Sequence, residues 1–473
     1  MHDYKKIGFK CGLEIHQQLE THKLFCNCPS IVHDENQPDM QFERRLRALA
    51  GESGEVDIAA SYEQSKNKRF LYEACSSSSC QVELDEEPIH GVNREALKIA
   101  LEIALLLKAK PLSKIQAMRK TVIDGSNVSG FQRTALIAVN GYLGTSKGKV
   151  GVPSICLEEE AAQKQEEAEG SRKFRLDRLG VALVEISTDA SIQDPEHAKE
   201  AASIIGMILR STGKVKRGIG TIRQDVNVSI AGKSRVEIKG FQDLRSIPVV
   251  IENEVSRQLK LEKTVPEVRK ANPDGTTSFL RPMPGAARMY PETDIRIIEV
   301  SPEFLESITL PELFSERALR LEKSYQMNAD LANAVARDCP ELFERCVGIV
   351  GKEEANFVAS MLTSMPTEIR RKHKLETDNI AEEDYLEVAA KLANREVPKD
   401  AVIEILTEMA RGNAVDYGKF KSLPESDLRE KLRQIVRENK GAPMGALMGE
   451  AMRHFRGKVD GKKIMDILKE LTS

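Results

Sequence analysis

Hydrophobic and polar residues alternate along two neighbouring stretches of the chain, residues 222–230 and 235–239. Alternation with a period of two predicts β-strands, and the β-branched residues at the apolar positions favour the same structure. Gly232 lies between the two stretches, so we expect them to form a hairpin. The polar face of this hairpin carries Arg223, Asp225, Asn227, Ser229, Arg235, Glu237 and Lys239.

The register of the hairpin decides whether these polar side chains meet. We expect Asn227 opposite Glu237 and Asp225 opposite Lys239, because a slip of one residue would move one polar row to the other face. The resulting face mixes cations, carboxylates, an amide and a hydroxyl. A solvent-facing amphipathic hairpin is the alternative interpretation. The mixture of charges favours a binding site.

A second alternating stretch, residues 6–19, places Glu14 and His16 two positions apart on its polar face. A carboxylate beside an imidazole suits metal binding or acid–base chemistry, while a surface strand with a chance Glu-x-His is the alternative. Glu158 ends another predicted strand, and Glu185 interrupts an apolar run. A buried carboxylate is seldom left without a partner, so both are candidates for the same site.

A loop rich in Gly, Ser and Asn covers residues 118–134. Such a loop can bring backbone N–H groups to an anion, together with the side chains of Arg119, Lys120 and Gln132. It matches no phosphate-loop pattern. The GKS at 232–234 also fails that test, because position 227 is Asn where the pattern requires Gly.

Helical periodicity predicts helices near residues 93–108, 195–213 and 246–263, between the strands. After Pro302 the strand patterns fade and amphipathic helices follow. The fold class is therefore α+β. Three domains are expected: one built on antiparallel sheet over residues 1–300, a helical domain over 301–405 and a small helical tail over 406–473.

The chain has 473 residues and a net charge of −3, so its overall charge indicates no partner. Residues 426–473 nevertheless hold eleven Lys and Arg against seven Asp and Glu. A basic tail on an acidic body suggests a phosphate-backbone partner, with solvated helix faces as the alternative. No signal peptide and no membrane span are evident, so we expect a cytoplasmic protein.

Eight cysteines are scattered through the chain, which suggests thiols or a metal site in a reducing compartment rather than disulfides. Two close pairs predict a four-cysteine zinc site formed by Cys26, Cys28, Cys75 and Cys80. Buried thiols without a metal are the alternative. We expect the acidic run at 83–87 to be a solvated loop.

Six motifs occur in order along the chain: GLEIHQQL with FCNCP, RKTVIDGSNVSGFQRT, LEEEAA, RLDRLG followed by LVEI, GTIRQDVNVSI with RVEIKG, and LRPMPGAARMYPETD. Together they resemble the GatB/GatE family of tRNA-dependent amidotransferase subunits, most closely its archaeal GatE branch. Residues 441–461 are similar to the tRNA-binding tail domain that the family shares with the YqeY proteins. The resemblance covers essentially the whole chain.

The resemblance implies a cradle-shaped catalytic domain, a helical domain and a YqeY-like tail. It also implies the conversion of Glu-tRNA(Gln) to Gln-tRNA(Gln). ATP, with Mg²⁺, phosphorylates the γ-carboxylate of the glutamyl group, and ammonia then displaces the phosphate. The ammonia would come from a GatD-like glutaminase of the asparaginase family, in a heterotetramer that binds tRNA(Gln).

Site residues follow from the same motifs. The implied catalytic residues are Glu14, His16, Glu158, Glu185, Asp225 and Glu237. The implied Mg²⁺ ligands are Glu14, His16 and Glu158. ATP and the aminoacyl end would be held by Arg223, Asn227, Ser229, Arg235, Lys239, Lys120 and Gln132. The tail cations assigned to tRNA are Arg433, Arg437, Lys440, Arg453, Arg456 and Lys458.

The sequence departs from the family pattern in several places. The helix near 246–263 runs directly into TVPEVRKANPDGTT, so an inserted domain similar to part of aspartyl-tRNA synthetase is missing. Glu160 stands where the motif has Asp and can still ligate a metal through its longer side chain. Ala182 replaces a usual Pro. Ser191 replaces a usual Asp and cannot supply its charge.

Two alternatives to a GatE-type enzyme stay open. One is a GatB-type subunit that also acts on Asp-tRNA(Asn), although the wording of RKTVIDGSN and RPMPGAARMYPETD favours the GatE branch. The other is a tRNA-binding module that has lost catalysis, which the missing insert and Ser191 favour. The presence of Glu14, His16, Asp225 and Glu237 opposes it.

Overall fold

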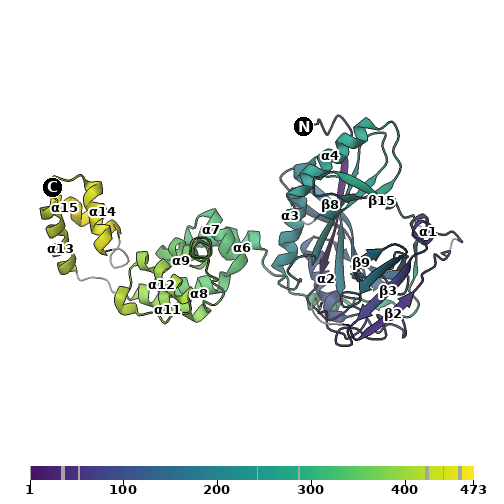
Figure 1. Cartoon of the computed structure of the whole chain (residues 1–473), viewed down its shortest axis with the longest axis horizontal. Coiled ribbons are helices and arrows are strands. Elements are labelled where there is room, and N and C mark those ends of the chain that lie inside the picture. The colour runs from purple at the N-terminus through teal and green to yellow at the C-terminus, as the bar shows by residue number, and fades with distance from the viewer. Residues whose placement is uncertain are drawn as a thin grey trace. The chain divides into compact units, whose positions relative to one another are not determined.

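The computed structural model divides the chain into two compact units (Figure 1). Unit 1 covers Met1–Pro311 and unit 2 covers Glu312–Ser473. The structure describes residues 2–32, 38–51, 54–241, 243–285, 288–420, 425–439, 441–455 and 461–472.

Unit 1 is built around a sheet of eleven strands within its described residues. Its pairs are antiparallel except for the parallel pair of β13 and β14. In spatial order the strands are β15 (Thr277–Pro282), β14 (Glu267–Ala271), β13 (Val236–Phe241), β12 (Ile222–Ser229), β1 (Lys10–Gln18), β11 (Ala182–Ser187), β8 (Gly148–Glu159), β7 (Phe131–Thr145), β6 (Ala117–Thr121) and β16 (Met289–Pro291), with β4 (Lys110–Pro111) also paired to β7.

Smaller elements complete unit 1. A four-stranded sheet has the order β2 (Met40–Arg44), β3 (Arg69–Ala74), β10 (Ser171–Arg175) and β9 (Gln163–Ala168). A two-stranded sheet pairs β5 (Lys114–Ile115) with β17 (Ile298–Glu299). The helices are α1 (Ile58–Ser65), α2 (Arg94–Leu106), α3 (Pro195–Ser211), α4 (Ser246–Lys260) and α5 (Pro302–Glu306).

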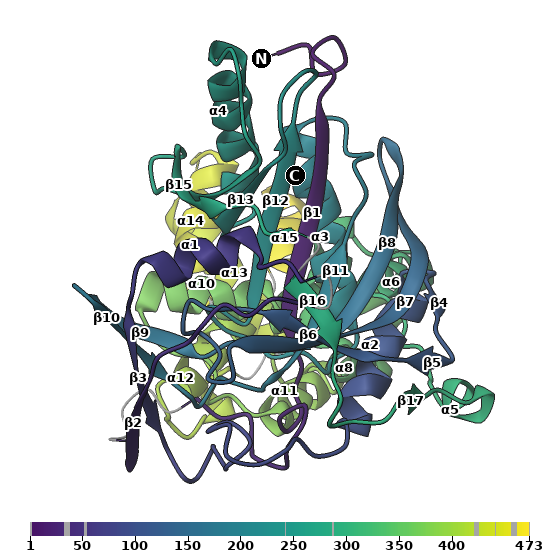
Figure 2. The same ribbon diagram turned by 90° about the vertical axis from the view of Figure 1, so that its right-hand side faces the viewer.

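The main sheet has one apolar and one polar face, as the alternation along its strands predicts. Helices α2, α3 and α4 pack against strands β1, β7, β8 and β12 (Figure 2). Leu13 and Ile15 of β1 are fully buried. Helix α2 is capped by Asn93, whose Oδ1 accepts hydrogen bonds from the N–H groups of Glu95 and Ala96. The three predicted helices are confirmed.

The predicted hairpin register is confirmed at its centre and wrong at one end. Asn227 lies opposite Glu237, as expected. A bulge follows, because Gln224 pairs with Phe241 rather than with the residue before it. Gly240, with φ +99°, takes the left-handed conformation that this extra residue needs. Asp225 therefore has no paired residue opposite it on β13, although the side chain of Lys239 still reaches its carboxylate.

The described part of unit 2 contains helices and no strand. They are α6 (Phe314–Tyr325), α7 (Ala329–Asp338), α8 (Pro340–Val350), α9 (Ala355–Leu362), α10 (Ser364–His373), α11 (Glu382–Ala393), α12 (Val402–Ala410), α13 (Glu425–Glu438), α14 (Met444–Phe455) and α15 (Gly461–Thr472), with the 3₁₀ turns η2 (Lys352–Glu354), η3 (Lys399–Ala401) and η4 (Tyr417–Phe420).

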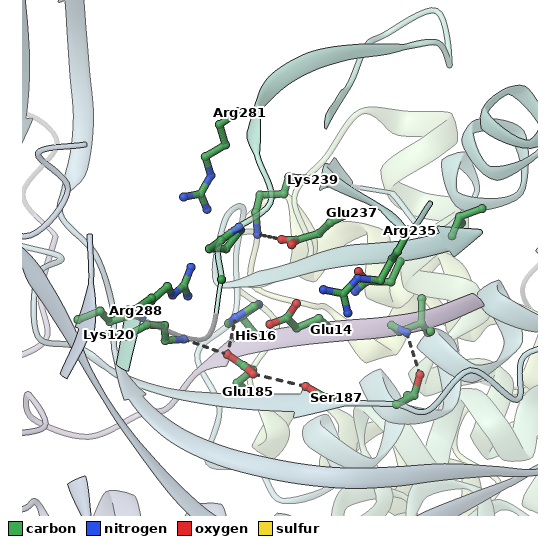
Figure 3. Close-up of a pocket in the computed structure, with 18 of the residues that line it drawn as sticks. Glu14, His16, Lys120, Glu185, Ser187, Arg235, Glu237, Lys239, Arg281 and Arg288 are labelled. Carbon is green, nitrogen blue, oxygen red and sulfur yellow. Dashed lines mark hydrogen bonds and ion pairs between the residues drawn. The ribbon is translucent and has the colours of Figure 1, made fainter. Parts of the chain in front are cut away.

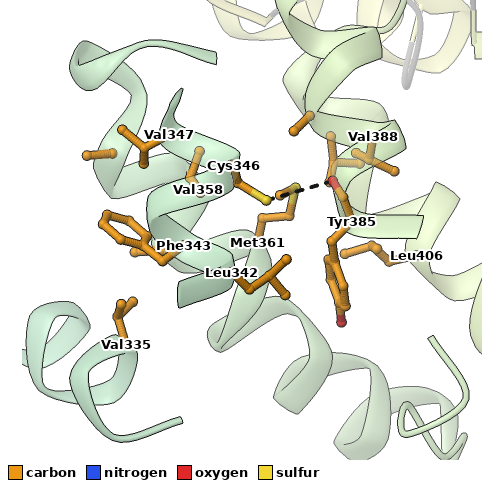
Figure 4. Packing of buried hydrophobic residues seen from close by; sticks show 14 of the residues in the cluster. Val335, Leu342, Phe343, Cys346, Val347, Val358, Met361, Tyr385, Val388 and Leu406 are labelled. Carbon is orange, nitrogen blue, oxygen red and sulfur yellow. Dashed lines mark hydrogen bonds between the residues drawn. The ribbon is translucent and has the colours of Figure 1, made fainter. Parts of the chain in front are cut away.

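Two hydrophobic clusters stabilise unit 2. The first joins α6 to α12 around Phe343, which is fully buried and makes an edge contact with Tyr325 (Figure 4). The second joins α13, α14 and α15 around Leu432, Phe455 and Leu468. The α+β class is confirmed, while the cradle, the YqeY-like tail and the boundaries at 300 and 405 stay predictions. None of the described helices is long and apolar enough to cross a membrane.

Candidate active site

A cavity of about 780 Å³ opens on the polar face of the main sheet. Strands β1, β11, β12 and β13 supply its floor. The walls come from the loop between β6 and β7 and from residues on either side of position 286, including Arg281 and Arg288 (Figure 3); the lining residues there are Val122, Asp124, Ser126, Asn127, Arg281, Pro284, Gly285, Arg288 and Met289. The cavity therefore gathers five distant parts of the sequence.

Strand pairing brings the polar side chains of the floor together. Glu14 of β1 lies beside Asp225 of β12. His16 lies between Glu185 of β11 and Arg223 of β12. Paired residues of neighbouring strands point to the same face of a sheet. The alternation of each strand thus places the predicted residues of three strands on one surface.

Glu14, His16 and Glu185 form a first group, whose ligand atoms all lie within 4.8 Å of one another. His16 Nε2 lies 3.3 Å from Glu185 Oε2. Lys120 Nζ lies 3.6 Å from the same oxygen and donates to Glu158 Oε1 at 2.7 Å. Lys120 therefore links the first group to Glu158.

The pKa values in this group follow from burial and neighbouring charge. Burial and the charge of Glu185 raise the pKa of Glu14 to about 7. Burial opposes the charged form of His16, but Glu185 raises the pKa of the imidazole. Burial also opposes the ionised form of Glu185, yet Lys120 and His16 hold its pKa below the ordinary range. Glu14 is thus the carboxylate short of countercharge, which a cation would supply.

Glu14, Asp225 and Glu237 form a second group, also within 4.8 Å. Lys239 Nζ contacts both Asp225 and Glu237. These two carboxylates raise the pKa of Lys239 although the ammonium is buried. Burial acts to raise the pKa of Glu237, and Lys239 outweighs it and lowers the pKa. Glu14 belongs to both groups.

The carboxylate oxygens of both groups fit Mg²⁺, which prefers oxygen ligands and leaves positions for phosphate and water, whereas the nitrogen of His16 lies outside that preference. The first group contains Glu14 and His16 of the predicted ligand set, but its third member is Glu185. Glu158 is only 1% exposed. Its carboxylate accepts hydrogen bonds from Lys120 and from Gln132.

The residues predicted to hold ATP or the aminoacyl end divide into two sets. Those that line the cavity are Lys120, Gln132, Asn227, Ser229, Arg235 and Lys239. Arg223 instead donates to Glu160, with Nη2 2.8 Å from Oε1. Burial opposes the ionised form of Glu160, but Arg223 and Arg178 lower its pKa. Glu160 therefore binds Arg223 and lies in neither carboxylate group, contrary to its expected role as a metal ligand.

Sequence reasoning missed several residues of the cavity. Arg281, Arg288, Ser187 and Asp189 line it. The arginines lie in the motif LRPMPGAARMYPETD, whose cations are the signal that could have pointed to them. Ser191 donates its backbone N–H to Asp189 at 3.1 Å, so a carboxylate remains next to the position where the family's Asp is lost.

A second candidate metal centre lies in unit 1. Cys26, Cys28, Cys80 and Glu83 bring their ligand atoms within 4.8 Å of one another. Three sulfur ligands and one carboxylate suit Zn²⁺. Cys75 is not part of this group, because its sulfur accepts a hydrogen bond from Arg175 at 3.3 Å. The predicted four-cysteine set was therefore wrong at Cys75.

Glu83 corrects a further expectation. It is buried, with 4% of its surface exposed, rather than part of a solvated loop. Cys26 Sγ donates to Glu83 Oε1 at 2.9 Å, and the backbone N–H of Cys80 donates to Oε2 at 2.8 Å. Burial and the charge of Glu83 raise the pKa of the Cys26 thiol. A bound cation would favour the thiolate instead.

Comparison with known proteins decides the family. A family model described as the GatB/GatE catalytic domain matches residues 9–306. The chain belongs to the GatB/GatE family. Similar proteins include the E-type subunit of the glutamyl-tRNA(Gln) amidotransferase of Methanosarcina barkeri, 36% identical over 99% of this chain and 98% of the relative. The protein of the same name from Methanocaldococcus jannaschii is 35% identical over 99% of both chains.

The length of these alignments is informative for this GatB/GatE chain. The alignment with the Methanosarcina barkeri protein spans 625 positions, whereas the chain has 473 residues. At least 152 aligned positions of the relative therefore have no residue here. This agrees with the predicted absence of an inserted domain.

Only three of the six predicted tail cations of this GatB/GatE chain lie among the described residues. Arg433 and Arg437 lie on α13 and line a groove on its surface. Arg453 on α14 is 78% exposed and lies 3.0 Å from Glu450. The remaining predicted tRNA contacts, Lys440, Arg456 and Lys458, fall outside the described residues.

Proposed function

We propose that this chain is the subunit of a tRNA-dependent amidotransferase that converts Glu-tRNA(Gln) to Gln-tRNA(Gln). The observation that carries the proposal is the cavity floor, where two carboxylate groups share Glu14 and face lysine and arginine side chains. The names of the full-length archaeal relatives support the same reaction. Such a floor suits a reaction in which negatively charged phosphates must be neutralised and positioned.

The reaction needs two steps, because a carboxylate is a poor electrophile. In the first, an oxygen of the glutamyl γ-carboxylate bonds to the γ-phosphorus of ATP. The bond to the bridging oxygen breaks, and its electron pair leaves with ADP. In the second, ammonia bonds to the acyl carbon, the carbon–oxygen bond to phosphate breaks, and inorganic phosphate and a proton leave.

Specific residues of the cavity fit the first step. Glu14, His16 and Glu185 would hold Mg²⁺, with Asp225 and Glu237 beside them. Bound Mg²⁺ supplies positive charge to the phosphate oxygens. Lys120 and Lys239 keep their charges within the cavity because carboxylates surround them. Asn227 Oδ1 is buried without a hydrogen-bond partner among the described residues and would accept one from a substrate.

The partners follow from what the chain lacks. The sequence shows no glutaminase nucleophile pattern, so ammonia would come from a GatD-like subunit, in a heterotetramer. The basic tail would bind tRNA(Gln) through its exposed cations. The cysteine and Glu83 group would hold Zn²⁺ as a structural ion.

The decisive assay uses the purified chain with Mg²⁺, ATP, ammonium chloride and either Glu-tRNA(Gln) or Asp-tRNA(Asn). Gln-tRNA(Gln) alone is the expected product. Products from both tRNAs would support the GatB-type alternative. Neither product nor ATP cleavage, with a GatD partner also supplied, would contradict the proposal and favour a binding module.

A further inference from the structure

Two arginines of the cavity wall have no carboxylate partner among the described residues. Arg281 ends β15, and Arg288 follows a Pro- and Gly-containing loop; both line the cavity. Among the described residues, neither guanidinium lies within 4.0 Å of a carboxylate oxygen, so neither forms a salt bridge. Figure 3 shows both side chains directed from the wall towards the sheet floor.

Other arginines of the same sheet behave differently. Arg119 and Arg133 both pair with Glu292, and Arg223 pairs with Glu160. The fold therefore neutralises these part-buried guanidiniums where they are structural. The two arginines of the wall instead direct their charge into the cavity.

Leaving these two cations together is unfavourable unless an anion joins them. Burial and the neighbouring charge of Arg281 lower the pKa of Arg288. An unpaired charge removed from water raises the free energy of the folded chain. A planar guanidinium presents two parallel N–H groups that match a phosphate. Two adjacent guanidiniums suit an anion with several oxygens and more than one negative charge, such as a phosphate group.

The structure also anchors Gly285, which lies three positions before Arg288 in the sequence. The backbone N–H of Gly285 donates to Asp57 Oδ2 at 2.8 Å. The other carboxylate oxygen of Asp57 caps α1 by accepting from Ala59 and Ala60. Asp57 is only 4% exposed. Asp57 therefore ties Gly285, at the cavity wall, to the start of α1.

We propose that Arg281 and Arg288 form a clamp for the terminal phosphate of ATP, opposite the two carboxylate groups of the floor. The inference rests on the proposed function, because it takes ATP as the ligand. Arg288 lies close enough to Lys120 for their charges to repel each other. The charges of both arginines also act to lower the pKa of Glu237. The clamp thus faces the place where a metal on Glu14 would meet the phosphate that is transferred.

The test compares Arg281→Met, Arg288→Met and the two corresponding Lys variants with Arg245→Met, whose arginine is 84% exposed and pairs with Asp243. Affinities for ATP and for ADP, each with Mg²⁺, are measured on the full chain by calorimetry. Turnover is measured at saturating ATP with Glu-tRNA(Gln) and ammonium chloride.

We expect both Met variants to bind ATP about tenfold or more weakly, while ADP affinity stays within about twofold of the unmodified chain. Turnover should fall by about a hundredfold or more, since such a clamp acts on charge in the transition state. The Lys variants should recover only part of the loss. Added guanidinium should partly restore the Met variants, which a merely structural defect would not permit.

Equal losses of ATP and ADP affinity would overturn the clamp, because they would place the arginines on the inner phosphates. Unchanged ATP affinity would overturn it as well. Far-ultraviolet circular dichroism melting of each variant identifies any that fail to fold, and the Lys variants then decide. In another outcome, the unmodified chain binds ATP more tightly than ADP, the Met variants lose that preference, and the unmodified chain still forms no Gln-tRNA(Gln). That result would contradict the proposed reaction but would support the clamp.

Discussion

Replacing Glu14 by Gln should stabilise the folded chain at alkaline pH while removing its activity. The folded chain raises the pKa of Glu14 to about 7, from an ordinary value of 4.5. A difference of about 2.5 units, at about 1.4 kcal/mol per unit, corresponds to about 3 kcal/mol. This is the order of magnitude by which the ionised carboxylate destabilises the site when no cation is bound.

The sign follows from proton linkage. The folded chain binds the Glu14 proton more tightly than the unfolded chain, so this contribution to stability is complete below about pH 4.5. It is lost as the pH rises through about 7. Gln is neutral at every pH. The variant and the original chain should therefore have similar free energies of unfolding at about pH 4, and the variant should be more stable by up to about 3 kcal/mol above about pH 8.

The assay is urea unfolding across this pH range in the presence of a chelator. Hydrogen exchange of peptides that cover β1 follows unit 1 separately, because the two units need not unfold together. Glu20→Gln is the matched control: its carboxylate is 64% exposed, so the substitution should change the free energy of unfolding by less than about 0.5 kcal/mol. A Glu14→Gln variant that is no more stable than the original chain at about pH 8 would refute the reasoning.

Two other predictions concern the metal centre and the helical core. Zinc content by mass spectrometry should fall from one ion per chain to none in Cys26→Ser but stay unchanged in Cys75→Ser, because only Cys26 belongs to the group with Glu83; equal loss in both would contradict the three-cysteine centre. Phe343→Ala should lower the free energy of unfolding of unit 2 by about 3–5 kcal/mol in urea titrations, since Phe343 is fully buried. Leu319→Ala, at a side chain 54% exposed, should cost less than about 0.5 kcal/mol, and similar losses in the two variants would refute the packing argument.

Local pattern accounts for the part of the site that the sequence predicted. Alternation with a period of two assigns each polar residue of β1 and β12 to one face, and the turn at Gly232 fixes the hairpin. The pairing of Asn227 with Glu237 therefore needed no tertiary information. The bulge at Gly240 was missed, because an extra residue in one strand leaves the alternation of both segments intact.

Contacts between distant segments account for most of the failures. Glu158 ends one predicted strand and Glu185 interrupts an apolar run, and only the order of strands in the sheet decides which one meets His16. The predicted zinc ligands failed for the same reason. The spacing of the cysteines favoured two pairs and gave no sign of Glu83, whereas in the fold the Cys75 sulfur contacts Arg175. Arg281 lies near the end of β15, and Arg288 is separated from it by a Pro- and Gly-containing stretch of the sequence, so periodicity could not show that both residues line one cavity.

The pair formed by Glu160 and Arg223 shows how a departure from the family motif can be tested. Glu160→Asp restores the motif's residue but withdraws the carboxylate by about 1.5 Å. The shorter side chain cannot reach both Arg223 and Gln18, which the present carboxylate contacts. Removing one partner of a buried pair costs about 3–5 kcal/mol. Because Asp keeps the charge, we expect a smaller loss of about 1–2 kcal/mol in urea unfolding.

A double-mutant cycle with Glu160→Gln and Arg223→Gln separates the pair from each residue's other contacts. Glu160 is 1% exposed and the Arg223 side chain is 33% exposed, so the two substitutions should be coupled by about 1–3 kcal/mol. Additive effects would mean that Arg223 is free to serve the cavity, as the family motif implied. Strong coupling would mean that the longer Glu160 has taken Arg223 out of the binding site, and that Lys120, Lys239 and the arginine wall must neutralise the phosphates without it.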